Sequence, residues 1–218
     1  MGGGPLRIQD HLILKGFREA MRADLPEELK LEIRKGLPPD LLYLLRKYPR
    51  ESWTAHPNLG GMAQFWLQRH DMFRELGGML KTSIADYREG KLAPHDFAAW
   101  FAPRLRFFLQ QLHGHHQIED MHYFPVFSAA ETRLSRGFDL LDADHHVIHG
   151  ALERNAETGS AFLQSLGAGR DRQLFAADQY GQENAALLAM LLRHLEDEED
   201  LIIPLILDRG EDKLGVGA

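Results

Sequence analysis

Apolar residues recur at steps of three or four along four long stretches of the chain, the spacing that gathers side chains on one face of an α-helix. The stretches cover residues 60–90, then from Pro94 or Pro103 to about Pro125, roughly 136–165 and roughly 171–206. No segment shows sustained alternation of apolar and polar residues, so strands are not expected. Four long helices joined by short loops predict an all-α fold, an up-down-up-down four-helix bundle.

Residues 1–57 have a different pattern, in which prolines interrupt short apolar pieces such as LLYLLRKY. Because proline ends or bends helices, this pattern predicts two or three short helices joined by loops. The chain then divides into a short helical N-terminal extension (1–57), a four-helix bundle (58–207) and a C-terminal tail (208–218).

Ionisable side chains interrupt the apolar faces of the four predicted helices. Two residues four apart lie on the same face, separated by about 400° of rotation and about 6 Å of rise, and can bind one object. Lone charged groups on an apolar face are costly unless they are paired or bound to a metal. The last three helices each carry one such pair, and the first carries a single histidine. These predicted metal ligands are His70, His115 and Glu119, His145 and His149, and His194 and Glu198.

One phrase appears twice in the chain. Residues 115–125 (HHQIEDMHYFP) and 194–204 (HLEDEEDLIIP) each place a Glu four residues after a His, a second acid at five and a Pro at ten. The repetition predicts two helical hairpins related by an approximate two-fold axis, in which the second helix of each hairpin carries the phrase. It leaves open whether Glu198 or its neighbour Glu199 is the inward-facing acid.

The amino-acid composition limits which kinds of site and partner the chain can offer. The chain has no cysteine and 12 histidines, so histidine and carboxylate side chains are the only strong metal ligands that it offers. A net charge of −7 disfavours nucleic-acid binding, which needs a basic surface. No stretch resembles an export signal or a membrane span, so we expect a cytoplasmic protein with no membrane partner.

Seven protein ligands are too many for one metal ion with histidine and carboxylate ligation. Two octahedral ions offer about twelve positions, and five imidazoles, two bridging carboxylates and a shared oxo or hydroxo bridge fill about eleven of them. In this count Glu119 and Glu198 are the bridges, and one position is left for a small ligand. Oxygen bridges and neutral imidazoles favour two iron ions over manganese or zinc.

Plainer explanations exist for each residue taken alone. A single histidine on an apolar face is usually a hydrogen-bonded core residue, and HLEDEED is also typical of a solvated acidic face. Glu119 followed by His122 matches the Glu-x-x-His of ferritin-like proteins, but the second copy at Asp142 and His145 is poor. Three metal-type pairs in phase on separate helices favour the metal site.

Several residues next to the predicted ligands are not expected to bind the metal themselves. His116 lies about 100° around the helix from His115, so we expect it at a helix interface or on the surface. Asp120 and Asp144 are candidate acceptors for ring N–H groups, which metal-bound histidines usually need. The aromatic residues that line the pocket, or simply belong to the core, are Trp66, Phe73 and Tyr123.

Together these motifs resemble the hemerythrin family, in particular the bacterial hemerythrin-like proteins with the HHE cation-binding motif. That family has a lone His on its first helix, His-x-x-x-Glu and a further acid on its second, His-x-x-x-His on its third, and a His with a carboxylate on its fourth. The resemblance covers roughly residues 58–207. The matching residues are His70, His115, Glu119, Asp120, His145, His149, His194 and Glu198, with Glu199 where many members have Asp.

The resemblance implies a non-heme di-iron centre that binds dioxygen or nitric oxide, in oxygen or redox sensing or carriage. One alternative is a di-iron oxidoreductase of the peroxidase, oxidase or nitric oxide reductase type, which needs a proton donor such as His122 or Tyr123 near the open position. Another is an iron-storage or iron-sensing protein. We assign no catalytic residue, leave a homodimer open, and expect any signalling output to need a partner protein.

Overall fold

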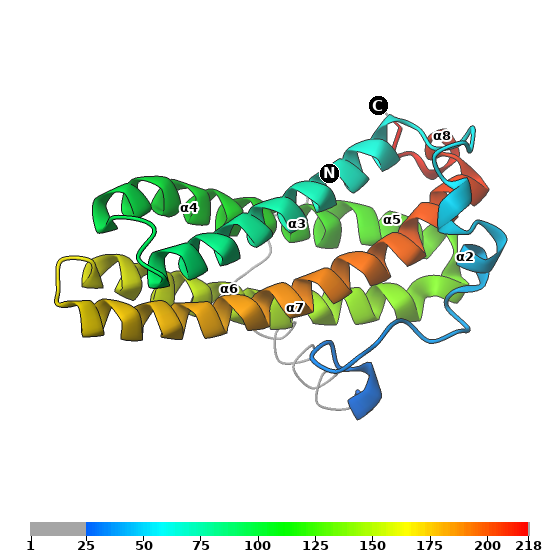
Figure 1. Ribbon diagram of the computed structural model, residues 1–218. Coiled ribbons are helices and arrows are strands. Elements are labelled where there is room, and N and C mark those ends of the chain that lie inside the picture. Colours follow the sequence, from blue (N-terminus) through cyan, green and yellow to red (C-terminus); the bar gives the residue numbers. More distant parts are fainter. Residues whose placement is uncertain (1–24, 218) are drawn as a thin grey trace, which may run out of the picture.

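The protein is all-helical in its computed structural model, which describes residues 25–217. The first 24 residues of the predicted extension, and the last residue of the predicted tail, lie outside the described part of the chain. Across residues 25–217 there is no strand, and no helix is long and apolar enough to cross a membrane. Figure 1 shows the long helices lying along one another, with short helices gathered at one end.

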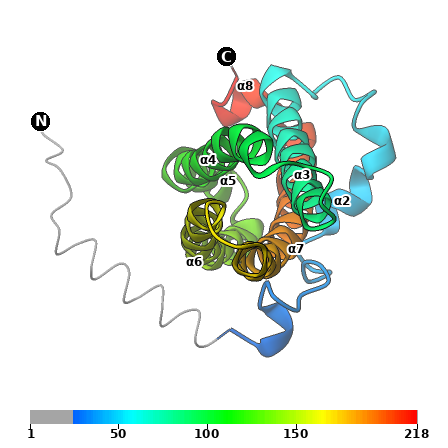
Figure 2. The ribbon, with the colours of Figure 1, turned by 60° about the vertical axis from the view of Figure 1, so that its left-hand side comes forward.

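Four long helices pack around a common core. α3 packs against α4 and α7, and α6 packs against the same two helices, so the four close a ring (Figure 2). A π turn and the short helix α5 continue the path of α4. The bounds are α3 Gly61–Arg88, α4 Pro94–Ile118, the π turn Glu119–Tyr123, α5 Phe124–Ala130, α6 Ser135–Ser165 and α7 Arg170–Arg209. All four stretches with helical periodicity are therefore helical.

The ends of the helices follow their local sequence. Pro94 occupies the first turn of α4, where its missing N–H would have had no partner in the helix. Gly90 follows the end of α3 with φ 76°, and Gly210 follows α7 with φ 83°. Glycine adopts these positive angles without steric cost, so both helices can stop there.

The π turn lies where the sequence predicts an unbroken helix. The backbone N–H of Phe124 donates to the carbonyl of Glu119, five residues back. Pro125, the next residue, has no N–H and cannot sit in an α-helix without crowding the carbonyl four residues before it. The wider turn accommodates this proline, and the helix then continues to Ala130.

Two apolar clusters fill the core, one on each side of a belt of buried polar residues. At the end distant from the short helices, the core is rich in aromatic rings, among them Tyr87, Phe97, Phe101, Phe162 and Tyr180. The other cluster contains Trp66, Phe127, Phe138 and Leu205. Along each long helix the residues of one cluster give way to those of the other, and the buried polar residues lie at the change.

The described part of the predicted extension, residues 25–57, packs on the bundle. It contains the 3₁₀ turns Glu27–Leu29 and Arg50–Ser52 and the helix α2 (Tyr43–Lys47), which lies against α7. Its residues Leu37, Leu41, Leu44 and Trp53 are buried in the second apolar cluster. At the same end of the bundle lie the 3₁₀ turn Thr132–Leu134 and α8 (Glu211–Leu214).

Candidate metal centre

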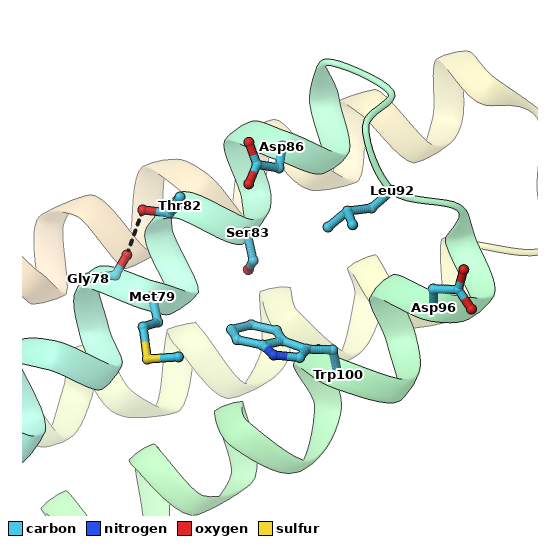
Figure 3. A pocket seen from close by; sticks show the side chains of 8 residues that line it. All are labelled: Gly78, Met79, Thr82, Ser83, Asp86, Leu92, Asp96 and Trp100. Carbon is cyan, nitrogen blue, oxygen red and sulfur yellow. Dashed lines mark hydrogen bonds between the residues drawn. The ribbon is translucent and has the colours of Figure 1, made fainter.

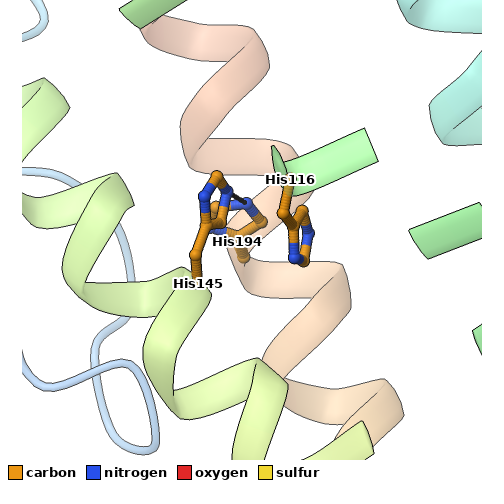
Figure 4. A group of neighbouring side chains, drawn as sticks. All are labelled: His116, His145 and His194. Carbon is orange, nitrogen blue, oxygen red and sulfur yellow. Dashed lines mark hydrogen bonds between the residues drawn. The ribbon is translucent and has the colours of Figure 1, made fainter. Parts of the chain in front are cut away.

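Seven buried or nearly buried side chains of metal-ligand type meet in the belt between the two apolar clusters. They fall into two groups, and within each group the ligand atoms lie within 4.8 Å of one another. His116 of α4, His145 of α6 and His194 of α7 form the first group, whose rings Figure 4 shows turned toward one another. The second group consists of His70, His115, Glu119 and Glu198.

The histidines approach each other in pairs through their Nε2 atoms. His70 Nε2 lies 3.2 Å from His115 Nε2, and His145 Nε2 lies 3.0 Å from His194 Nε2. Each pair joins neighbouring helices, α3 with α4 and α6 with α7. Two imidazole nitrogens that face one point are the arrangement in which both can bind one metal ion.

Glu119 spans the two histidine pairs. Its Oε1 lies 2.9 Å from His115 Nε2, and its Oε2 lies 3.5 Å from His145 Nε2. A carboxylate that presents one oxygen to each pair is placed as a bridge between two ions would be.

Glu198 repeats this arrangement from α7. Its Oε1 lies 3.8 Å from His70 Nε2, and its Oε2 lies 3.3 Å from His194 Nε2. The repeated His and Glu of the two phrases are therefore used in the same way, as the approximate two-fold relation predicts.

The innermost polar atoms have no hydrogen-bond partner among the described residues. Both carboxylate oxygens of Glu119 and of Glu198 are buried and unbonded, and so are both ring nitrogens of His116. Buried polar groups are normally satisfied, because leaving them bare costs free energy. A donor set of neutral imidazoles and carboxylates suits a transition-metal ion such as iron, so these residues fit the metal that the site implies.

Carboxylates behind the histidines hold three of the rings by Nδ1. His70 Nδ1 donates to Glu199 Oε1 at 2.9 Å, and His145 Nδ1 donates to Asp120 Oδ1 at 2.6 Å. His194 Nδ1 lies 3.3 Å from Asp144 Oδ2. These bonds fix each ring so that Nε2 is the atom free to face the centre.

The second acid of the repeated phrase therefore has its own place. Asp120 and Glu199, each one residue after a buried glutamate of the centre, both hold the histidine of another helix. Glu199 also contacts Arg74, at 2.7 Å. Of the two candidate acids in α7, the structure turns Glu198 toward the imidazole Nε2 atoms and Glu199 toward the back of His70.

Burial and mutual contact shift the pKa values of these groups. Burial lowers the pKa values of His115, His116 and His145 well below the ordinary value for histidine, so these rings are neutral. Neutral imidazoles are the form that binds a metal.

His194 is shifted in the opposite direction. Burial pushes the pKa of His194 down, but the nearby carboxylates of Asp144 and Glu198 outweigh burial and raise it to about 9. At neutral pH His194 of the metal-free protein is therefore the doubly protonated, positively charged imidazolium. Its Nε2 lies 3.0 Å from Nε2 of neutral His145.

The two glutamates also differ. Burial and the nearby Glu198 raise the pKa of Glu119 well above its ordinary value. Burial acts on Glu198 in the same sense, but the adjacent His70 and His194 outweigh it and lower the pKa of Glu198. One of the two carboxyl groups is protonated while the other is charged, which avoids two bare charges in one buried space.

The structure brings together six of the seven predicted ligands and leaves out His149. His149 is half-buried between α6 and α4, with its ring centroid 4.6 Å from that of His113. It lies four residues beyond His145, about 6 Å further along α6.

His116, which was not among the predicted ligands, belongs to the first group. It is 0% exposed, and its ring stacks on that of His145 with the centroids 4.0 Å apart. It therefore lies at the interface of α4 and α6, one of the two places expected for it. A signal was present in the sequence, since His116 follows the core residue Leu112 by four.

Aromatic residues surround the His70 and His115 side. Trp66 lies 6.0 Å from His115 and 5.0 Å from Tyr123 between ring centroids, and Phe73 lies 5.2 Å from His115. The indole N–H of Trp66 is buried and has no acceptor among the described residues. His122, which the ferritin-like alternative needs, is exposed and belongs to neither group of ligand-type residues.

A pocket of about 680 Å³ lies elsewhere, on the outer side of α3 and α4 (Figure 3). Trp100 and Met79 form its apolar wall, and the Thr82 hydroxyl donates to the carbonyl of Gly78. It shares no residue with either group of ligand-type side chains. The candidate centre is therefore a packed interior site, distinct from this surface hollow.

Comparison with known proteins gives one match. A family model described as the hemerythrin HHE cation binding domain matches residues 61–206. No curated protein and no solved structure matches the chain. The matched range begins with α3, ends within α7 and includes every residue of both groups, whereas residues 25–57 lie before it.

Proposed function

Because the chain belongs to the hemerythrin HHE cation-binding family, we propose that its two groups of ligand-type residues hold two iron ions and that the pair binds a small diatomic molecule, dioxygen or nitric oxide. The four long helices serve as an up-down-up-down bundle that carries the ligands. The role proposed for the protein is oxygen or redox sensing, or oxygen carriage.

The residues divide naturally between two ions. His116, His145 and His194 would hold one ion, and His70 and His115 would hold the other. Glu119 and Glu198 would be shared, because each presents one oxygen to each histidine pair. Iron bound in this donor set would supply a redox-active centre with a coordination position for a diatomic ligand.

The observation that carries the proposal is the state of the two glutamates. Each is fully buried, spans both histidine pairs and has two oxygens without a hydrogen bond among the described residues. A structural pair of buried carboxylates would be expected to end on hydrogen-bond donors. Two shared cations satisfy all four oxygens at once.

Three imidazoles serve one group and two serve the other, so the open position belongs with His70 and His115. That side is bounded by Trp66 and Phe73, whose rings exclude water, while the buried Trp66 N–H is available as a donor to a polar ligand atom. Reversible binding is favoured over oxidase or peroxidase chemistry because His122 is exposed and Tyr123 packs its ring against Trp66 and Phe127.

The decisive test is an optical spectrum of anaerobically iron-loaded protein, taken before dioxygen, after dioxygen and after its removal. Metal is quantified on the same sample. Two irons per chain with a visible band that appears and then disappears are expected for a carrier or sensor. A band that decays irreversibly to an oxidised species contradicts reversible binding and favours an oxidoreductase, and less than one iron per chain contradicts the two-metal centre.

A further inference from the structure

Two arginines that lie before the matched domain reach the back of the metal centre. Both belong to the described part of the extension, residues 25–57, which precedes the family match at 61–206. Arg34 is 4% exposed and enters the bundle between α6 and α7. Arg50 begins the 3₁₀ turn Arg50–Ser52, and its side chain is 40% exposed.

Arg34 is one step removed from His194. Its Nη1 donates to Asp144 Oδ1 at 3.1 Å, its Nη2 donates to Asp144 Oδ2, and its Nε donates to Asp197 Oδ2 at 2.9 Å. The same Oδ2 of Asp144 lies 3.3 Å from His194 Nδ1. A two-pronged contact of this kind fixes the plane of the carboxylate as well as its position.

Arg50 stands in the same relation to His70. Its Nη1 donates to Glu199 Oε2 at 2.9 Å, and Glu199 Oε1 accepts from His70 Nδ1 at 2.9 Å. Further bonds from Arg50 to Asp200 at 2.7 Å and to the Glu196 carbonyl at 3.0 Å lock the guanidinium onto α7. Each arginine thus ends on a carboxylate that also contacts a ligand-type imidazole, and Glu199 contacts Arg74 of α3 in addition.

The two imidazoles reached in this way share one glutamate. His70 and His194 are the two histidines that face Glu198, at 3.8 and 3.3 Å. The extension therefore acts on a single edge of the centre, the one that Glu198 spans, rather than on unrelated residues. A carboxylate behind a metal-binding histidine orients the ring and raises its basicity, and a cation behind that carboxylate modulates both effects.

We propose that residues 25–57 are a clamp on the metal centre, in which Arg34 and Arg50 position His194 and His70 through Asp144 and Glu199. The clamp rests on the proposed function, since it presumes that these histidines bind metal. The arginines are positioning residues, and they set the affinity and the electronic properties of the metal pair. The simpler alternative is that they only fasten the extension to the bundle.

Lys47 supplies a matched control for that alternative. Its ammonium group bonds Asp208 Oδ1 at 2.6 Å, so it also ties the extension to α7. Neither Lys47 nor Asp208 contacts a histidine of the centre. Lys47→Gln therefore removes a fastening without touching either path to the metal.

The experiment compares full-length protein with Arg34→Gln, Arg50→Gln and Lys47→Gln, each loaded with Co²⁺ as the probe metal. Affinity is measured by competition with a chelator, the ligand field by visible absorption, and folding by circular dichroism. We expect each arginine variant to bind Co²⁺ about 10–100-fold more weakly with shifted visible bands. Lys47→Gln should match the parent in both.

The outcomes are distinct. Folded arginine variants with the parent's affinity and spectrum would overturn the clamp. If Arg34→Gln fails to fold because Asp144 and Asp197 lose their buried partner, Arg50→Gln, at a half-exposed site, decides the question alone. If the parent itself binds fewer than two Co²⁺ per chain, the two-metal proposal fails first, and that result is separate from any effect of the arginines.

Discussion

His115–Pro125 in α4 and α5 and His194–Pro204 in α7 share a His, two acids and a Pro at the same spacing, and the protein uses the His and both acids alike. In both, the His faces a partner imidazole, the acid at four spans the two histidine pairs, and the acid at five holds a histidine from another helix. Among the ligand-type residues of the centre, the difference lies at the second position, which is His116 in one phrase and Leu195 in the other.

That one difference divides the centre unequally. His116 adds a third imidazole beside His145 and His194, whereas Leu195 is buried in the apolar cluster with Phe73. A near-symmetric scaffold thereby holds two unequal sites, one rich in ligands and one bounded by apolar side chains. In the proposed two-metal centre, unequal ligation would let one ion accept an external molecule while the other stays saturated.

The largest effect is expected from removing the carboxylate of Glu198, whose two oxygens face both histidine pairs. Glu198→Ala should lower the metal content from about two ions per chain to less than one, because each ion loses a ligand. The neighbouring exposed residue supplies the control, since Glu196→Ala should leave two ions bound. Metal analysis after gel filtration gives the answer, and two retained ions in Glu198→Ala would remove Glu198 from the ligand set.

A smaller effect should follow from making the two phrases equal. His116→Leu copies the residue at Leu195 and should reduce the content to about one ion, because only the His145 and His194 side loses a ligand. His122→Gln, at an exposed histidine of the same phrase, is the control. If His149→Leu lowers the metal content and His116→Leu does not, the family pattern describes the site better than this structure.

Replacing Asp120 or Glu199, the acid that follows each buried glutamate, should weaken metal binding less than replacing a ligand. Asp120→Asn weakens the acceptor for His145 Nδ1 and should reduce metal affinity by about 10–100-fold without changing the number of ions. Competition with a chelator of known affinity measures this change. An affinity equal to that of the parent would mean that the ring of His145 is held in place by packing alone.

The smallest effect concerns the acid stability of the metal-free protein. Burial lowers the pKa of His116, so below pH ~6.5 the unfolded chain takes up a proton that the folded chain refuses, and stability falls as the pH falls. Leu195 has no such group. His116→Leu should therefore lose less stability than the parent on acidification from pH 7 to 5.5, by about 1 kcal/mol or about 2–4 °C in Tm.

His194 does not disturb that comparison. Its pKa of about 9 is raised above the unfolded value, so its contribution is complete below pH ~6.5 and is lost only as the pH rises through about 9. The same proton is present in both proteins over the acid range. Thermal unfolding followed by circular dichroism at the two pH values makes the measurement, and equal losses in parent and variant would contradict a buried neutral His116.

Helical periodicity predicted the four long helices because burial of one face dominates their stability, and six of the seven predicted ligands lie in the two groups of ligand-type side chains. It could not choose between His115 and His116, which lie about 100° apart. Both turn inward in α4, which packs against α3 and α6. The π turn was also missed, since it is a compromise between Pro125 and the continuing helix.

The contacts that residues 25–57 make behind the candidate metal centre could not be predicted from sequence patterns, for a different reason. Arg34 contacts Asp144, which is 110 residues away, and Arg50 contacts Glu199, 149 residues away. Periodicity describes neighbours along one element and holds no information on which distant elements meet. Asp144 was recognisable as an acceptor for a ring N–H, whereas its arginine partner was not.

The π turn has a consequence for aligning the two halves of the protein. Because a π turn holds one more residue than an α turn, every position after it is displaced by about 100° relative to a regular helix. Pro125 and Pro204 occupy the same place in the repeated phrase, yet Pro125 is exposed and Pro204 is buried. Letter-by-letter alignment thus pairs exposed His122, Pro125 and Val126 with buried Leu201, Pro204 and Leu205. A superposition of α5 on the end of α7 therefore requires a one-residue gap within 119–123.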